Sequence, residues 1–98
     1  MRPRETTTIT WRDVTCQVDH IPDWKIDGWS KLMIRVVHPR GAPLPFCEDG
    51  YHVHELDEDD LKAAGGAVAF VLSWLDRDAD HPRYTQALYK WRQGDLFR

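Results

Sequence analysis

The sequence predicts an α+β fold: an antiparallel sheet of three to four strands with two helices packed on one face, in the order β-β-β-β-α-α. Two observations predict it. The first half of the chain alternates apolar and polar residues in short runs rich in Val, Ile, Thr, Trp and Tyr, as half-buried strands do. The second half spaces its apolar residues three and four apart, as helices do. Strands followed by helices place those helices on one side of an antiparallel sheet.

Four alternating runs mark the strands. They are residues 6–11, 14–18, 31–37 and 51–56. Arg12-Asp13 separates the first two runs and predicts a hairpin turn. The third run carries apolar residues on both of its faces, which indicates a central strand. The segment that follows it contains three prolines within seven residues, from Pro39 to Pro45, so we expect it to be a loop.

Helix signals begin at Asp57. This residue can cap a helix, and the acidic residues after it suit a first helical turn. We expect a short helical turn at 57–64, because two glycines inside a helix would cost about 2 kcal/mol relative to Ala. Gly65-Gly66 therefore breaks the helix, and the main helix runs from about 66 to 78.

The main helix and a second helix carry apolar stripes. The main stripe consists of Val68, Val71, Leu72 and Leu75, with Ala67, Phe70 and Trp74 beside it. Pro82 suits the first turn of the second helix, whose stripe consists of Tyr84, Leu88 and Trp91. We expect Gly94 to end this helix in a left-handed cap.

Size and composition indicate one domain over residues 1–98, with 1–5 flexible and 94–98 either flexible or packed. The chain is 42% apolar and 30% charged, with five Trp, a net charge of −3 and a pI near 5.9. This charge argues against general nucleic-acid binding, which needs a basic surface, but it leaves room for a local basic patch.

The cysteines and the hydropathy pattern indicate a cytoplasmic protein. Cys16 and Cys47 occur without a signal-peptide pattern, so we expect reduced thiols. The longest apolar stretch, residues 67–75, is too short to cross a bilayer.

Cys47, His52 and His54 form a candidate metal site. Residues 52 and 54 point to the same side of a strand, and two imidazoles with a thiolate could bind zinc. The alternatives are a Cys47 nucleophile with a histidine base, or half-exposed strand histidines beside a buried thiol. No oxyanion hole or substrate pocket is marked, so we expect no cofactor and favour a protein that is not an enzyme.

Trp24 and Trp29 form a candidate surface aromatic site. They lie in a loop with Lys25, and such a set can stack the bases of single-stranded nucleic acid. The competing interpretation is a loop that its two rings anchor to the core.

The middle of the chain resembles a family of small bacterial hypothetical proteins. The motifs that carry the resemblance are Pro43-Leu-Pro45, Gly50-Tyr51-x-x-His54, Gly65-Gly66, Trp74-Leu75-Asp76 and a Leu-Phe ending, over residues 30 to 97. The resemblance implies a single bacterial domain and brings no activity with it.

The C-terminal segment is the sharpest functional signal. Gln93-Gly94-Asp95-Leu96-Phe97 resembles the peptide, of the form Gln-Leu-Ser/Asp-Leu-Phe, with which many bacterial replication and repair proteins bind the DNA polymerase sliding clamp. Four of the five positions match, and Gly94 departs from the usual Leu. The alternative is that Gly94 caps the helix and returns Leu96 and Phe97 to the protein's own core.

Three functions therefore remain open. The first is a non-catalytic interaction module that docks to the sliding clamp through Gln93, Asp95, Leu96 and Phe97. The second is a small dimeric structural or regulatory domain whose tail packs on its own core. The third is a metal-dependent activity at the cysteine–histidine site. The first two imply a protein partner, and none implies a membrane.

Overall fold

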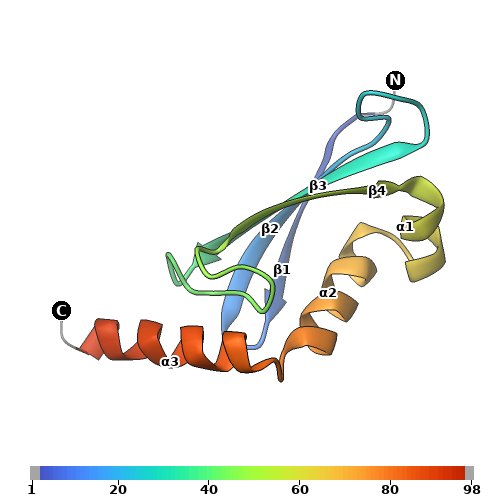
Figure 1. Ribbon diagram of the computed structural model, residues 1–98. Helices are drawn as coiled ribbons and strands as arrows, with labels where there is room; N and C mark the ends of the chain where they lie inside the picture. The colour runs from blue at the N-terminus through green and yellow to red at the C-terminus, as the bar shows by residue number, and fades with distance from the viewer. Residues whose placement is uncertain (1–2, 97–98) are drawn as a thin grey trace.

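The computed structural model describes residues 3–96 and contains one four-stranded antiparallel sheet followed by three helices (Figure 1). The strands are β1 (Glu5–Trp11), β2 (Val14–Ile21), β3 (Trp29–His38) and β4 (Tyr51–Asp57). The helices are α1 (Glu58–Ala64), α2 (Ala67–Asp78) and α3 (Pro82–Leu96). The predicted fold class and element order are confirmed, with the short turn at 57–64 forming a helix of its own.

The sheet is a simple meander in the order β1-β2-β3-β4. Arg12 and Asp13 turn the chain between β1 and β2, with Trp11 paired to Val14 and Arg12 at a φ of 54°. The predicted hairpin is therefore present. β3 lies between β2 and β4, so its prediction as a central strand is confirmed.

The two faces of the sheet have different environments, and β3 shows this most clearly. Leu32 and Ile34 are fully buried on the face that the helices cover. Arg35 and Val37 are exposed on the opposite face, which no helix in residues 3–96 covers. We call these the helix-covered face and the open face. An antiparallel sheet tolerates this asymmetry because its side chains alternate between faces.

The helix boundaries between α1 and α2 follow the capping chemistry of the sequence. The Asp57 carboxylate accepts a 2.8 Å hydrogen bond from the Asp59 backbone N–H, which caps α1. Gly65, at a φ of 98°, ends α1 in the left-handed conformation, and its N–H bonds to the carbonyls of Leu61 and Lys62. The predicted cap and glycine break are confirmed.

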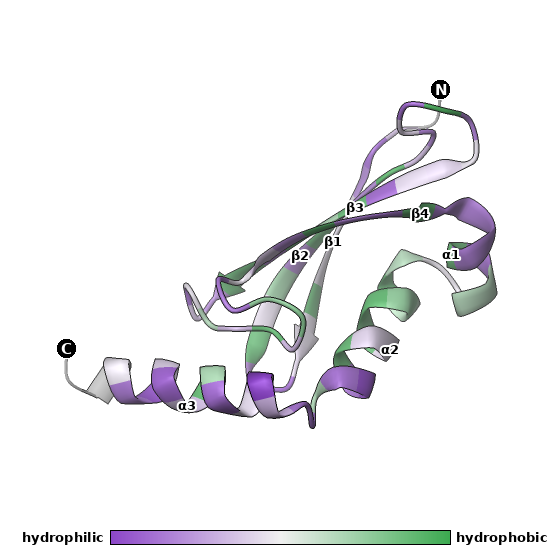
Figure 2. Ribbon diagram, in the orientation of Figure 1, coloured by the Kyte–Doolittle hydropathy of each residue, from purple (hydrophilic) through white to green (hydrophobic). Residues whose placement is uncertain are grey.

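α2 consists mostly of hydrophobic residues (Figure 2), and its apolar side chains pack against the core on the helix-covered face. Its Val71 and Leu75 side chains are fully buried. Trp11, at the end of β1, donates from its indole N–H to the Asp76 carboxylate of α2 at 2.8 Å. The same indole lies 5.9 Å, centroid to centroid, from the ring of Tyr84 in α3. Trp11 thus connects the sheet to both long helices.

The loop at 39–50 contributes to the core, which the sequence did not predict. Ala42 and Leu44 are each 1% exposed. Leu44 and Cys47 exchange two backbone hydrogen bonds of 2.8 and 3.0 Å, which fold the loop into a tight turn. This turn places Phe46 against Trp74 of α2, with ring centroids 4.2 Å apart. The loop therefore closes one end of the helix-covered face.

α3 leads away from the sheet toward the C-terminus (Figure 1). Tyr84 is buried, and Leu88 and Trp91 are half-buried against the core, as their stripe predicts. The prediction that Gly94 ends this helix is wrong, because the helix continues to Leu96 and Gly94 does not have a positive φ. Within residues 3–96, no helix is long and apolar enough to cross a membrane.

Gly50 supplies the first testable prediction. It sits before β4 at a φ of 77°, and a Cβ there would lie 2.9 Å from the Ala42 carbonyl oxygen. Gly50→Ala should lower the free energy of unfolding by about 2–4 kcal/mol, from left-handed strain and overpacking together. Gly41→Ala is the matched control, because Gly41 has a φ of 81° but open space around it. It should cost only about 1–2 kcal/mol. Equal losses in urea denaturation would contradict this account of the loop.

Candidate functional site

Residues 92–94 of α3 follow Trp91 without packing against the core. Trp91 is half-buried, whereas Arg92, Gln93 and Gly94 are exposed. The Gln93 side-chain amide donates a 2.8 Å hydrogen bond to the Tyr89 hydroxyl on the same helix. A Cβ at Gly94 would meet no atom within 4 Å. This part of the helix therefore projects into solvent.

The remaining residues of the candidate clamp peptide are only partly described. The backbone of Asp95 and Leu96 belongs to α3, and Phe97 lies outside the described residues. The predicted turn that would return the chain to the core is absent from residues 3–96, because the backbone stays helical through Leu96. The structure thus places the peptide at the end of a helix rather than after a cap.

Trp24 and Trp29 lie in and next to the loop between β2 and β3. The Lys31 ammonium of β3 sits 4.0 Å from the centroid of the Trp24 ring. The Trp29 indole N–H donates to the Glu55 carboxylate of β4 at 3.3 Å. Neither ring belongs to the buried core cluster, and both are half-buried. The loop is therefore held by polar and cation–π contacts to neighbouring strands.

His52 and His54 lie side by side on the helix-covered face of β4, as their spacing predicts, with ring centroids 6.1 Å apart. Trp74 of α2 contacts both rings, at 5.4 Å from His52 and 4.8 Å from His54. Phe46 and Phe70 complete the cluster, at 5.2 Å from His52 and 5.7 Å from His54 respectively. The two imidazoles pack as half-buried aromatic side chains.

The electrostatics of the cluster follow from this packing. Burial lowers the pKa of His52, and the neighbouring His54 lowers it further, against a small opposing effect of Asp49. Burial alone lowers the pKa of His54. Across the described residues, no three His, Cys, Asp or Glu side chains are grouped closely enough to hold a metal ion. The Cys47, His52 and His54 zinc site thus stays a prediction from sequence.

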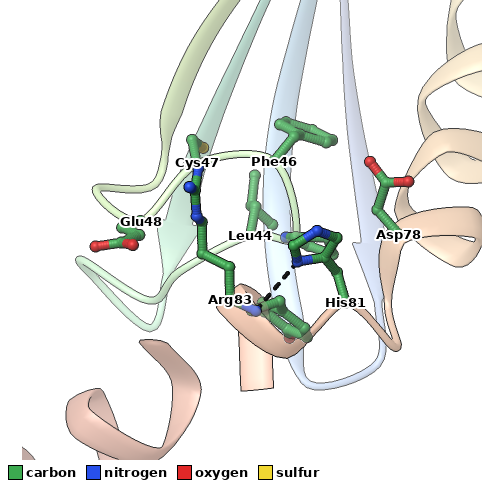
Figure 3. A pocket seen from close by; sticks show the side chains of 9 residues that line it. Leu44, Phe46, Cys47, Glu48, Asp78, His81 and Arg83 are labelled. Atoms are coloured by element: carbon green, nitrogen blue, oxygen red, sulfur yellow. Dashed lines mark hydrogen bonds between the residues drawn. The ribbon is translucent and has the colours of Figure 1, made fainter. Parts of the chain in front are cut away.

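A cleft of about 370 Å³ lies between the 44–48 turn and the junction of α2 with α3 (Figure 3). Its polar lining residues are Cys47, Glu48, Asp78, His81, Arg83 and Tyr84. The His81 imidazole Nδ1 accepts a 3.1 Å hydrogen bond from the Arg83 backbone N–H and so caps α3. Sequence reasoning missed this cleft, because only the folded loop brings the turn at 44–48 to the start of α3.

The thiol in this cleft does not have the properties of an activated nucleophile. Burial raises the pKa of Cys47 to about 11, and the charge of Asp49 adds to the rise. A reactive cysteine instead needs a lowered pKa, from a neighbouring cation or a helix N-terminus. The cleft therefore combines acidic, basic and neutral groups around a thiol that stays protonated at neutral pH.

The fold and these surfaces define a small α+β domain. Helices cover one face of its sheet, residues 92–94 of α3 are exposed, and the thiol in its cleft is not activated. The chain belongs to the family described as the KlcB third domain, whose model matches residues 4–84. Neither a curated protein nor a solved structure matches the chain. The family match covers the whole sheet, α1, α2 and the first residues of α3. The candidate clamp peptide lies beyond it.

The histidine pair generates a pH prediction. The folded-state pKa values of His52 and His54 lie below the ordinary value of 6.5, so the unfolded chain binds more protons as the pH falls below that value. The contribution of this pair to the free energy of unfolding is therefore greatest above pH 6.5 and decreases as the pH falls below it.

The double variant His52→Phe/His54→Phe keeps the rings and removes the titration. Its free energy of unfolding should depend less on pH between 7.5 and 5 than that of the native chain, as measured by denaturant titration. His38→Gln is the control, because His38 is exposed and lies outside the cluster, and the pH dependence that comes from the pair should persist in this variant. An identical pH slope in the double variant and the native chain would show that the cluster is not the titrating element.

Proposed function

We propose that this domain is a non-catalytic interaction module that presents the end of α3 to a protein partner, with the bacterial sliding clamp as the candidate partner. The observation that carries the proposal is the exposure of residues 92–94 near the end of α3. Arg92, Gln93 and Gly94 have no packing against the core, while the adjoining sequence matches four positions of a clamp-binding peptide. The exposed residues 92–94 thus overlap the start of the matching sequence.

The helical state of Gln93 to Leu96 is compatible with docking in an extended conformation. The last four carbonyls of a helix have no partner inside the helix, so its final turn is the least costly to unwind. A glycine destabilises a helix by about 1 kcal/mol relative to alanine, and Gly94 lies in this turn. Unwinding from Gly94 would free the segment without disturbing the packing of Tyr84 and Leu88.

The expected affinity is modest. Burial of Leu and Phe side chains contributes about 1.5–3 kcal/mol each, and part of this is offset by ordering of the segment. Since Gly94 lacks the side chain that the usual Leu provides, we expect a dissociation constant in the micromolar range. Such an affinity is useful when a ring-shaped partner offers several equivalent sites.

A non-catalytic role agrees with the chemistry of the cleft. The raised pKa of Cys47 keeps its thiol protonated. His52 and His54, the bases that the sequence offers to Cys47, do not line the cleft and pack against Trp74. Their environment supports a structural role for this side of the protein.

The tail proposal predicts a specific pattern of binding. A peptide of residues 90–98 and the full chain should both bind sliding clamp in surface plasmon resonance or fluorescence anisotropy. Phe97→Ala should weaken binding at least tenfold, since it removes one anchor side chain. Gly94→Leu in the peptide should strengthen it, because the substitution restores the usual residue.

Gln86 and Gln93 provide a matched pair of controls. Both are exposed on α3, but only Gln93 belongs to the peptide. Gln93→Ala should weaken clamp binding, while Gln86→Ala should leave it unchanged. Absence of binding at several hundred micromolar clamp, for the peptide and the full chain alike, would exclude the proposal.

A second candidate is a homodimer formed through a sheet edge. In residues 3–96, β1 and β4 each pair with one strand only. β1 has the sequence ETTTITW, which lacks the Lys or Pro that commonly protects an edge strand. Sedimentation equilibrium should then show a dimer that Thr8→Lys, on β1, disrupts because it places a charge on the edge strand. Thr85→Lys, at an exposed position of α3, is the matched control and should leave the dimer intact. A monomer at millimolar concentration would exclude this candidate.

A further inference from the structure

The open face of the sheet carries an unusual combination of side chains for a protein with a net charge of −3. Lys31, Met33 and Arg35 point to this face from the central strand β3. Tyr51, directly opposite Arg35 on β4, is 46% exposed. Val53 beside it is 39% exposed. Basic, aromatic and apolar groups thus meet on one uncovered surface.

A buried carboxylate organises the polar part of this surface. Asp19 is 5% exposed and pairs with the guanidinium of Arg4. It also accepts hydrogen bonds from the Thr6 hydroxyl at 2.8 Å and the Gln17 amide at 3.2 Å. Burial acts to raise the pKa of Asp19, but these bonds outweigh it and leave the pKa lowered. Asp19 is therefore ionised, and Arg4 compensates its charge locally.

The same network positions Arg35. The Gln17 side-chain carbonyl oxygen accepts a 3.2 Å hydrogen bond from Nη2 of Arg35, while the Gln17 amide is committed to Asp19. Arg4, Met33, Arg35 and Tyr51 line a hollow of about 130 Å³ above this network. The guanidinium of Arg35 is thus oriented at the rim of a small hollow beside an exposed aromatic ring.

The charges on this face do not cancel. Among its carboxylates, Asp19 pairs with Arg4, Glu55 lies 4.0 Å from Lys25 and directly opposite Lys31, and Asp57 caps α1. Lys31 and Arg35 make no ion pair within the part of the chain that the structure describes. They lie four positions apart on the strand, which is about 14 Å. Lys31 and Arg35 therefore flank Met33 along the central strand. Lys31 lies opposite Glu55 and over the Trp24 ring, whereas Arg35 bonds only to the neutral Gln17 side chain.

We propose that the open face binds single-stranded nucleic acid, with Lys31 and Arg35 contacting phosphates and Tyr51 stacking on a base. Met33 and Val53 form the apolar floor between these contacts. An aromatic ring on a cationic surface is the arrangement that holds single strands without reading their sequence. A duplex offers no exposed base face to Tyr51, so it should bind less tightly.

The charges argue against a second copy of this chain as the occupant. A two-fold related copy would place Lys31 and Arg35 against an identical surface whose carboxylates are already paired. Its cations would then face cations. A polyanion supplies the missing charge, and release of its counterions favours binding. The site lies inside the region matched by the family model and apart from the α3 segment.

The test is a fluorescence anisotropy titration of the full chain against labelled dT12 and rU12 at several salt concentrations. Binding should be salt-dependent, with a slope of log affinity against log salt near −1.4 for two phosphate contacts. Arg35→Ala should reduce this slope by about 0.7. Tyr51→Ala should weaken binding about tenfold, whereas Tyr51→Phe should retain it. The two oligonucleotides distinguish DNA from RNA.

Matched controls separate this surface from the rest of the protein. Tyr89 is 63% exposed on α3, and Arg77 is exposed on α2, so Tyr89→Ala and Arg77→Ala should leave binding unchanged. Phe97→Ala should also have no effect, which separates this inference from the clamp proposal. No binding at 200 micromolar protein in low salt would overturn the inference. Equal losses in Tyr51→Ala and Tyr89→Ala, or tighter binding of duplex, would overturn it as well.

Discussion

The structure depends on the burial of only one face of the sheet. A four-stranded meander must cover its apolar side chains, and here α2 covers them with help from elements before and after it. Leu32 and Ile34 below and Val71 and Leu75 above are all fully buried. The hydrogen bond from Trp11 to Asp76 fixes the end of α2 over the end of β1. Everything that the helices do not cover is left to solvent or to a partner.

This constraint explains the role of the elements outside the sheet. A helix as short as α2 cannot cover a four-stranded sheet alone, so the loop at 39–50 and the first turn of α3 complete the layer. Leu44 and Tyr84 supply those contacts. After Trp91, residues 92–94 of α3 are exposed to solvent. The exposed helix end and the open face are two consequences of the same limited core.

Much of the fold could be predicted from local sequence signals. The strand alternation, the Asp57 cap and the Gly65-Gly66 break act over a few residues, so they are readable from sequence. The contribution of Leu44 to the core was not predicted, because it depends on a loop closing against a helix some thirty residues later. Gly94 was mispredicted because its neighbours favour a helix over a cap, and tertiary or local context commonly overrides a single glycine.

The candidate surfaces were predictable only in part. Spacing correctly placed His52 and His54 on one side of β4, but the rings of Phe46, Phe70 and Trp74 around them come from distant segments. Likewise, the sequence alone indicates Trp24 and Trp29 as a candidate aromatic site, whereas the pairing of the more exposed Tyr51 with Arg35 depends on the register of β3 with β4. Sequence shows which groups exist, and the topology decides which groups meet.

The central claim, that the end of α3 is an autonomous docking element, is tested most directly by NMR of the 15N-labelled full chain with unlabelled sliding clamp. The account predicts signal broadening and shifts from Arg92 to the C-terminus, with the amides of β2 and β3 unperturbed. Perturbation centred on the Cys47 cleft or on the sheet, with an unchanged α3 end, would contradict it.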